Sequence, residues 1–99
     1  MIRAVWTAPC SLTITGHAGY AEKGKDIVCA GVSTLWGTLA AELEDRAWNG
    51  EGELHLTGDT IAFIAENPAE IQRVFAMIWR GLLLLAGRYG EYIDAERTW

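Results

Sequence analysis

Residues 53–70 read ELHLTGDTIAFIAENPAE, and this stretch contains two predicted strands, the turn between them and the start of a helix. Apolar and polar residues alternate over residues 53–57 and again over residues 60–65, which predicts two β-strands. The Gly58-Asp59 pair between them is typical of a tight hairpin turn. The segment 67–70, N-P-A-E, combines an N-cap asparagine, a proline at the first helical position and a capping-box glutamate. The stretch therefore predicts a β-hairpin that leads directly into a helix.

The predicted helix after residue 67 is strongly apolar and ends at Gly90. One face carries apolar residues at helical spacing: Ile71, Val74, Phe75, Ile78, Leu82, Leu85 and Tyr89. Three further residues widen the apolar surface beyond this face: Met77, Leu83 and Leu84. A helix of this kind is expected to be covered on two sides. A second copy of the chain can supply the second cover, so we expect a homodimer.

The residues before 53 show the same order of elements. Alternation over residues 2–7 and 12–16 predicts two strands, the second ending near His17, with a break at residues 8–10. Apolar residues then recur every three or four positions across residues 26–48, which predicts a helix that begins at the N-cap Asp26. The Asn49-Gly50 pair is typical of a helix end.

With residues 91–96 as a short last strand, the predicted order is β-β-α-β-β-α-β. Two hairpins and two helices predict an α+β layered fold with a mostly antiparallel sheet. At 99 residues the chain is long enough for one hydrophobic core, so we expect a single domain over residues 1–99.

Charge and hydropathy narrow the function classes. The net charge is −5, the opposite of the balance that nucleic-acid binding usually requires, so a basic partner is favoured over RNA or DNA. No signal peptide is predicted at the N-terminus, and the most apolar segment, residues 74–86, is interrupted by Arg80 and too short to span a bilayer. We therefore expect a cytoplasmic protein, with no membrane partner and with Cys10 and Cys29 as free thiols. Neither a zinc-ligand spacing nor a glycine-rich phosphate loop is present, so no metal and no cofactor are predicted.

Cys29 and His17 are the candidate catalytic residues. Cys29 lies in the first turn of the predicted helix, where free N–H groups and the helix dipole stabilise the negative charge of a thiolate. His17 lies at a strand end, across a loop long enough to fold back over that turn. An imidazole beside a thiolate acts as the general base and then the general acid of a cysteine hydrolase. A cysteine in such a position is otherwise an inert small hydrophobic residue.

Other residues near this pair are candidates for supporting roles. Asp26 and Ser33 share a helix face with Cys29; Asp26 is first of all a helix cap, and Ser33 fits packing and function equally well. The charged, glycine-bounded residues 19–25 read as a mobile loop in which Gly24, like Gly16 just before the histidine, is a pivot. Further expectations concern four other residues: His55 and Cys10 are expected to be structural, and Trp6 or Trp36 is expected to line a pocket that accepts an aromatic side chain.

The pattern G-H-A, seven residues, D-x-x-C, three residues, S, over residues 16–33, resembles the ribosomal-processing cysteine protease family, Prp. The resemblance implies a homodimeric, cytoplasmic thiol protease that acts in ribosome biogenesis. Members of the Prp family remove a short N-terminal extension from the large-subunit ribosomal protein numbered twenty-seven and cut it after an aromatic pair, so the resemblance implies the same reaction here. It also implies that Cys29 is the nucleophile and His17 its base. The supporting residues would be Gly16, Asp26 and Ser33, and the loop that closes over the peptide would include Gly19, Tyr20 and Gly24.

Two functions of other classes compete with proteolysis. One is a non-catalytic dimer that binds a ribosomal or nascent peptide, with Cys29 as a vestigial nucleophile. The other is a thiol redox sensor in which Cys29 oxidises reversibly and His17 is not needed.

Overall fold

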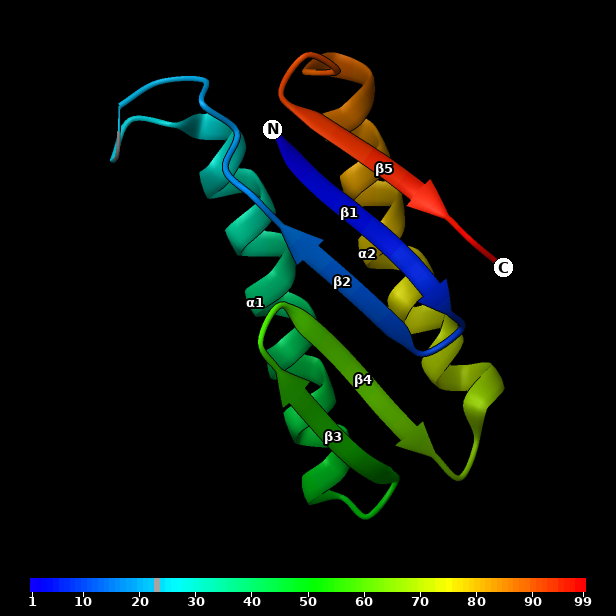
Figure 1. Cartoon of the computed structure of the whole chain (residues 1–99). Helices are drawn as coiled ribbons and strands as arrows, with labels where there is room; N and C mark the ends of the chain where they lie inside the picture. Colours follow the sequence, from blue (N-terminus) through cyan, green and yellow to red (C-terminus); the bar gives the residue numbers. More distant parts are fainter. Residues whose placement is uncertain (23) are drawn as a thin grey trace.

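Each of the two helices follows a pair of strands, and a last strand ends the chain's fold, as the sequence predicts. The computed structural model describes residues 1–22 and 24–99, and Figure 1 shows its elements. Their bounds are β1 (Ile2–Ala8), β2 (Ser11–Thr15), α1 (Ile27–Trp48), β3 (Gly52–Thr57), β4 (Thr60–Ala65), α2 (Pro68–Arg88) and β5 (Ile93–Arg97). The predicted order β-β-α-β-β-α-β is therefore confirmed. Several strand bounds differ from the prediction by one or two residues: β1 ends at Ala8, β2 runs from Ser11 to Thr15, β3 begins at Gly52 and β5 runs from Ile93 to Arg97.

The strands form one sheet in the order β3-β4-β2-β1-β5. Neighbouring strands are antiparallel except that β5 runs parallel to β1, so the expectation of a mostly antiparallel sheet is confirmed. The two predicted hairpins, β1-β2 and β3-β4, meet where β2 pairs with β4, with Leu12 opposite Ile61. This junction joins the two halves of the chain into a single α+β domain.

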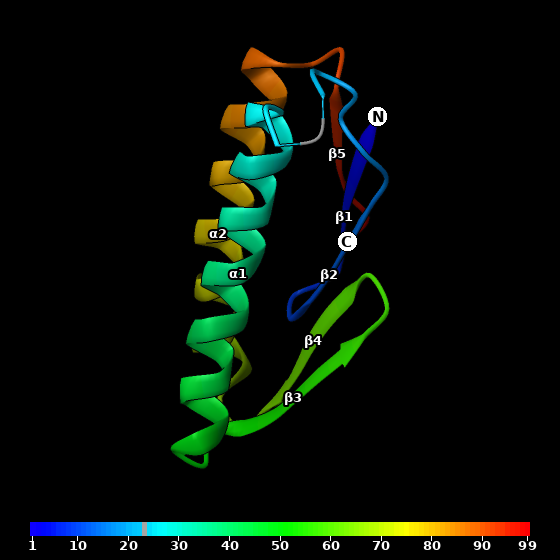
Figure 2. The same cartoon turned by 90° about the vertical axis from the view of Figure 1, so that its left-hand side faces the viewer.

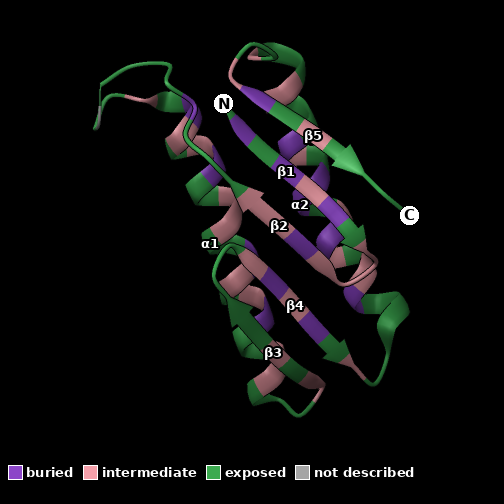
Figure 3. Ribbon diagram, in the orientation of Figure 1, coloured by how far each residue is buried: buried purple, intermediate pink, exposed green. Residues whose placement is uncertain are grey.

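Both helices lie on the same face of the sheet, as Figure 2 shows. The core fills the space between the helices and the sheet, and Figure 3 marks the buried residues on the strands and on both helices. Its largest fully buried side chains are Phe75, Leu12, Leu39, Leu43, Ile61, Ile71, Leu82, Ile93 and Val28. The helices approach closely because Gly31 of α1 faces Leu85, and Gly81 of α2 faces Leu35. A side chain at either glycine would meet a leucine, so both positions set the distance between the helices.

The start of α2 differs from the predicted capping box. Asn67 is the N-cap residue and Pro68 follows it, but the Asn67 side chain makes no capping hydrogen bond. Glu70 instead pairs with Arg46, with its Oε1 2.9 Å from Arg46 Nη1. Arg46 also contacts two other glutamates, Glu42 and Glu51. The prediction of a capping box was wrong because this arginine, at the end of α1, competes for the Glu70 carboxylate.

Within residues 1–22 and 24–99, neither helix combines the length and the hydropathy needed to cross a membrane.

Candidate active site

Cys29 lies in the first turn of α1, as predicted. Its side chain is partly exposed, and its Sγ accepts a hydrogen bond from the backbone N–H of Ala18 at 3.4 Å. Ala18 is buried and follows β2, so the segment after the strand folds over the helix end. An N–H that points at a sulfur stabilises negative charge on it, and the N-terminus of a helix does the same. Both groups therefore direct partial positive charge at the Cys29 sulfur.

Asp26 holds this end of α1 together. Its Oδ1 accepts the N–H groups of Val28 at 3.0 Å and Cys29 at 2.9 Å, which confirms it as the N-cap. Its Oδ2 accepts the N–H of Tyr20 at 3.0 Å. One carboxylate thus joins the helix start to the segment that follows Ala18. The role of Asp26 in positioning Cys29 follows from these bonds, since its oxygen holds the cysteine's own N–H.

These hydrogen bonds make the stability of the fold depend on pH. The N–H of Cys29 is the main cause that lowers the pKa of the Asp26 carboxyl from its ordinary value of 3.8; burial opposes it, and the N–H of Tyr20 adds to it. A lowered pKa means that the folded chain binds this proton less tightly than the unfolded chain. The carboxylate therefore contributes stability that is fully present above pH 3.8 and is lost as the pH falls through the lowered pKa.

We expect Asp26→Asn to have a lower midpoint of thermal unfolding than the native chain at neutral pH, because the amide is uncharged and has one acceptor oxygen. The gap between the two midpoints should stay constant well above pH 3.8 and close below it. Thermal unfolding followed by circular dichroism from neutral to acidic pH measures this gap. A gap that persists unchanged in acid would contradict the role of this carboxylate.

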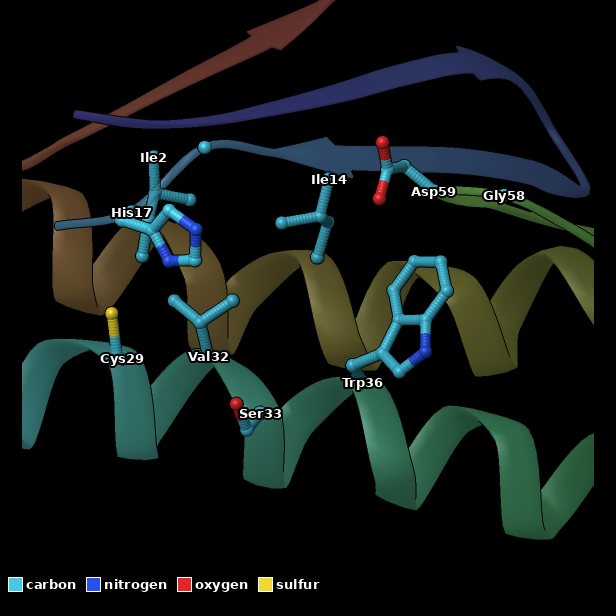
Figure 4. A pocket seen from close by; sticks show the side chains of 10 residues that line it. Ile2, Ile14, His17, Cys29, Val32, Ser33, Trp36, Gly58 and Asp59 are labelled. Atoms are coloured by element: carbon cyan, nitrogen blue, oxygen red, sulfur yellow. The ribbon is translucent and has the colours of Figure 1, made fainter. Parts of the chain in front are cut away.

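His17 follows β2 and is exposed. The residue before it, Gly16, has φ +85°, a backbone conformation that residues other than glycine rarely adopt. A Cβ at this position would also collide with the carbonyl oxygen of Met1. Gly16 thus lets the chain turn out of the sheet at the point where the histidine must reach α1. In Figure 4 the imidazole of His17 and the Sγ of Cys29 lie at the same end of one pocket.

Two pockets meet at these side chains. The first, of about 350 Å³, lies between α1 and the sheet, and the second, of about 550 Å³, lies between α1 and the loop residues Gly19, Ala21 and Gly24. His17, Cys29 and Ser33 line both pockets. The thiol and the imidazole are therefore open on two sides, as the reactive groups of an endopeptidase must be to accept chain on both sides of a bond.

The predicted loop residues Gly19, Tyr20 and Gly24 differ in their surroundings. Gly19 and Gly24 line the second pocket, together with Asp26. The Tyr20 ring instead packs edge-on against Tyr89, at 5.7 Å between centroids, and Tyr92, at 5.1 Å. The predicted loop also includes Lys23, which lies outside the described residues. Tyr20 therefore anchors its segment to the end of α2.

Trp6 and Trp36 are the two alternative predicted linings of a pocket that accepts an aromatic side chain. Trp36 lines the first pocket, whereas Trp6 is buried in the core against Trp79 at 5.7 Å between ring centroids. The first pocket also contains Ile14 and Asp59, which the sequence analysis did not single out. The only signal for Asp59 was its place in the hairpin turn, which by itself indicates no contact with α1. Ser33 is exposed and lines both pockets, so the structure places it at the site.

Comparisons with known proteins agree with this arrangement. The essential ribosomal processing protease Prp from S. aureus, solved with a covalently linked product peptide, has the same fold, with a TM-score of 0.82 and 22% identity over 99% of this chain and 100% of that chain. The same protease solved with a substrate peptide has a TM-score of 0.76 at 21% identity, with 99% and 100% of the two chains covered. SMU.848 from Streptococcus mutans has a TM-score of 0.73 at 29% identity, with 99% and 97% covered. No curated protein matches the chain significantly.

The family model described as cysteine protease Prp matches residues 1–94. This match includes the whole sheet up to Asp94, both helices and every residue of the site described above. The match therefore covers the helix N-terminus that carries the thiol and the histidine at the same end of the pocket. The chain belongs to the cysteine protease Prp family, and it is accordingly a cysteine protease.

Proposed function

We propose that this chain is an endopeptidase in which Cys29 is the nucleophile and His17 the general base. We further propose that it removes a short N-terminal extension from the precursor of the large-subunit ribosomal protein numbered twenty-seven, cutting after two aromatic residues. One observation supports the pair of roles most directly. The Cys29 Sγ, at the start of α1, accepts the N–H of Ala18 and shares its pocket with the His17 imidazole.

The proposed reaction has two halves. His17 takes the thiol proton, the Cys29 sulfur attacks the peptide carbonyl carbon, and the carbonyl oxygen becomes an oxyanion. The N–H of Ala18, which points at the sulfur, is available to that oxyanion. The intermediate then expels the amine, which receives the proton from His17, and a thioester remains on Cys29. Water, deprotonated by His17, hydrolyses the thioester and restores the thiol.

The supporting residues act on geometry in this proposal. Gly16 turns the chain so that His17 faces α1, and Asp26 holds the N–H of Cys29. Ser33, one turn after Cys29, contacts the peptide from the pocket wall. Gly19 and Gly24 line the second pocket, so the segment around Gly19 would border one side of the peptide. Tyr20 holds this segment on Tyr89 and Tyr92.

The ribosomal substrate and a cytoplasmic location are supported by likeness and by charge. The S. aureus protein of the same fold is a ribosomal processing protease and was solved with a substrate peptide. A chain with a net charge of −5 suits a basic ribosomal protein, because opposite charges speed their encounter.

The test is cleavage of a synthetic peptide. The peptide carries a short extension that ends in two aromatic residues, followed by the start of the mature ribosomal protein, and a matched peptide has alanine at both aromatic positions. We expect mass spectrometry to find one cut after the aromatic pair and none in the matched peptide. If the first peptide binds and remains intact after long incubation, the non-catalytic peptide-binding function is supported and cleavage of this substrate is contradicted.

The proposal includes a homodimer. Met77 and Leu84 lie seven residues apart on α2, on its surface away from the sheet, with 71% and 76% of their areas exposed. Large apolar side chains that are exposed together on one helix face mark an interaction surface, and a second copy of the same helix is self-complementary to it.

We expect the native chain to elute as a dimer and Leu84→Glu as a monomer, because the variant would bury a charge at the interface. Size-exclusion chromatography with light scattering gives the mass of each. Leu56→Glu is the matched control: Leu56 is 52% exposed but lies on β3, so this variant should remain dimeric. A monomeric native chain, or a dimeric Leu84→Glu, would exclude this surface as the interface.

A further inference from the structure

The first pocket has a second end, away from the thiol. Figure 4 shows Cys29 and His17 at one end of the pocket, and the Trp36 indole and the Asp59 carboxylate at the other. Trp36 comes from α1, and Asp59 comes from the turn between β3 and β4. The mechanism proposed above uses neither residue.

The position of Asp59 is fixed by the sheet. Its backbone oxygen accepts the N–H of Ile14 at 2.9 Å, which ties the β3-β4 turn to β2. Gly58, with φ +57°, allows the tight turn that puts Asp59 beside the neighbouring strand. Ile14 itself lines the pocket between the two ends. The backbone of Asp59 is therefore fixed beside the pocket by a main-chain hydrogen bond to β2, while its carboxylate remains exposed to solvent.

The chemistry of this end suits a cation. Among the described residues that line the pocket, Asp59 is the only acidic one, and none is a lysine or an arginine. Within residues 1–22 and 24–99, no basic side chain forms a salt bridge with its carboxylate. An indole and a carboxylate that line the same end of a pocket can each attract a lysine or arginine side chain, the first by a cation–π contact and the second by an ion pair.

The spacing along α1 relates this end to the reacting bond. Trp36 follows Cys29 by seven residues, which on an α-helix is about 10 Å along the axis. An extended peptide advances about 3.3 Å per residue. A peptide that lies along α1 with its reacting carbonyl at Cys29 therefore brings roughly its third residue from the cut to Trp36.

We propose that the Trp36–Asp59 end of the pocket is a specificity subsite for a lysine or arginine side chain, carried by the substrate about three residues from the cut bond. The subsite rests on the proposed endopeptidase function and deepens it, because it names a basic residue as a second determinant beside the aromatic pair. The peptide side chain lays its apolar stem over the indole and places its charge at Asp59.

The experiment compares peptides that differ only at the third residue before the cut or the third residue after it, with lysine, glutamine or glutamate there. For the native enzyme we expect kcat/KM at one of these positions to be about three- to tenfold higher for lysine than for glutamine, and lower again for glutamate. This preference should weaken at high salt, because exposed charges are screened. Equal kcat/KM for lysine and glutamine at both positions would overturn the proposal.

Asp59→Asn tests the residue itself. The change keeps the size and the turn preference of the side chain and removes its charge, so the lysine preference should disappear. Asp94→Asn is the matched control, because Asp94 is also exposed but lies on β5, outside the pocket, and this variant should keep the preference. Trp36→Phe should retain part of the preference and Trp36→Leu less of it. An unchanged lysine preference in Asp59→Asn would assign the recognition elsewhere.

Binding separates this subsite from the catalytic proposal. The affinities of fluorescent lysine and glutamine peptides for the native chain and for Asp59→Asn can be measured by anisotropy in Cys29→Ala backgrounds, where no cleavage interferes. Tighter binding of the lysine peptide that depends on Asp59 supports the subsite even if the native enzyme cuts neither peptide. Cleavage without any Asp59-dependent difference in binding or kcat/KM supports the protease function and contradicts the subsite.

Discussion

Replacement of Cys29 by alanine is expected to lower kcat for peptide cleavage by roughly 10⁴- to 10⁶-fold. The alanine side chain is not a nucleophile, so it cannot attack the carbonyl carbon and no thioester can form. The fold should persist, because Cys29 is partly exposed and the hydrogen bond that caps α1 uses its backbone N–H, which alanine retains. Initial rates measured by chromatography of the cleaved peptide give the loss, and circular dichroism verifies folding.

Cys10→Ala is the matched control. Cys10 follows β1 in a turn, and its Sγ lies 3.8 Å from the carbonyl oxygen of Pro68, away from both pockets. Burial raises the pKa of the Cys10 thiol, so this thiol stays protonated at neutral pH and is a poor nucleophile. The variant should cut the peptide at the native rate. Native activity in Cys29→Ala, or its loss in Cys10→Ala, would overturn the assignment of the nucleophile.

Replacement of His17 by alanine is expected to lower kcat/KM by about 10²- to 10⁴-fold, the usual contribution of a general base. Without the imidazole, the thiol must lose its proton to water, and the leaving amine has no donor. Two measurements follow this change: the pH profile of kcat/KM, and the rate at which iodoacetamide alkylates Cys29 at each pH. We expect both profiles to move to more alkaline pH in His17→Ala.

His55→Ala is the control for this variant. His55 is the other histidine of the chain and lies on β3, where its Nε2 is 3.4 Å from the Glu53 carboxylate. It lines neither of the pockets around the thiol, so this variant should leave both pH profiles unchanged. An alkylation profile of Cys29 that is the same in His17→Ala as in the native chain would favour the redox-sensor function, which does not need the histidine.

Much of the fold could be predicted because its signals are local. The alternation in residues 53–57 and 60–65, with Gly58 between them, specified the β3-β4 hairpin, and Asp26 specified the start of α1. The capping box at Glu70 failed for the opposite reason. The pattern of residues 67–70 is local, but Arg46, which takes the Glu70 carboxylate, is 24 residues away in the chain.

The candidate site divides in the same way. The motif in residues 16–33 placed Cys29, His17 and Asp26 together, because a strand end and a helix start that are joined by a short loop must be neighbours. The hydrogen bond from Ala18 to the Cys29 sulfur lies within this same stretch. Asp59 could not be found in this way. It reaches the pocket only because β2 pairs with β4, which brings Ile14 to the β3-β4 turn.

From the sequence alone followed the order of strands and helices, the cap that starts α1 and the thiol in its first turn. The histidine that lines the same pocket as this thiol follows β2, a short loop earlier in the chain. These features depend on residues close together in the chain, where spacing alone sets which groups meet. The tertiary structure decided that the β3-β4 turn lines the first pocket, that Trp36 rather than Trp6 lines it and that Arg46 binds Glu70. These contacts join residues far apart in the chain, and which of them form depends on how the sheet pairs its strands and how the helices pack on it.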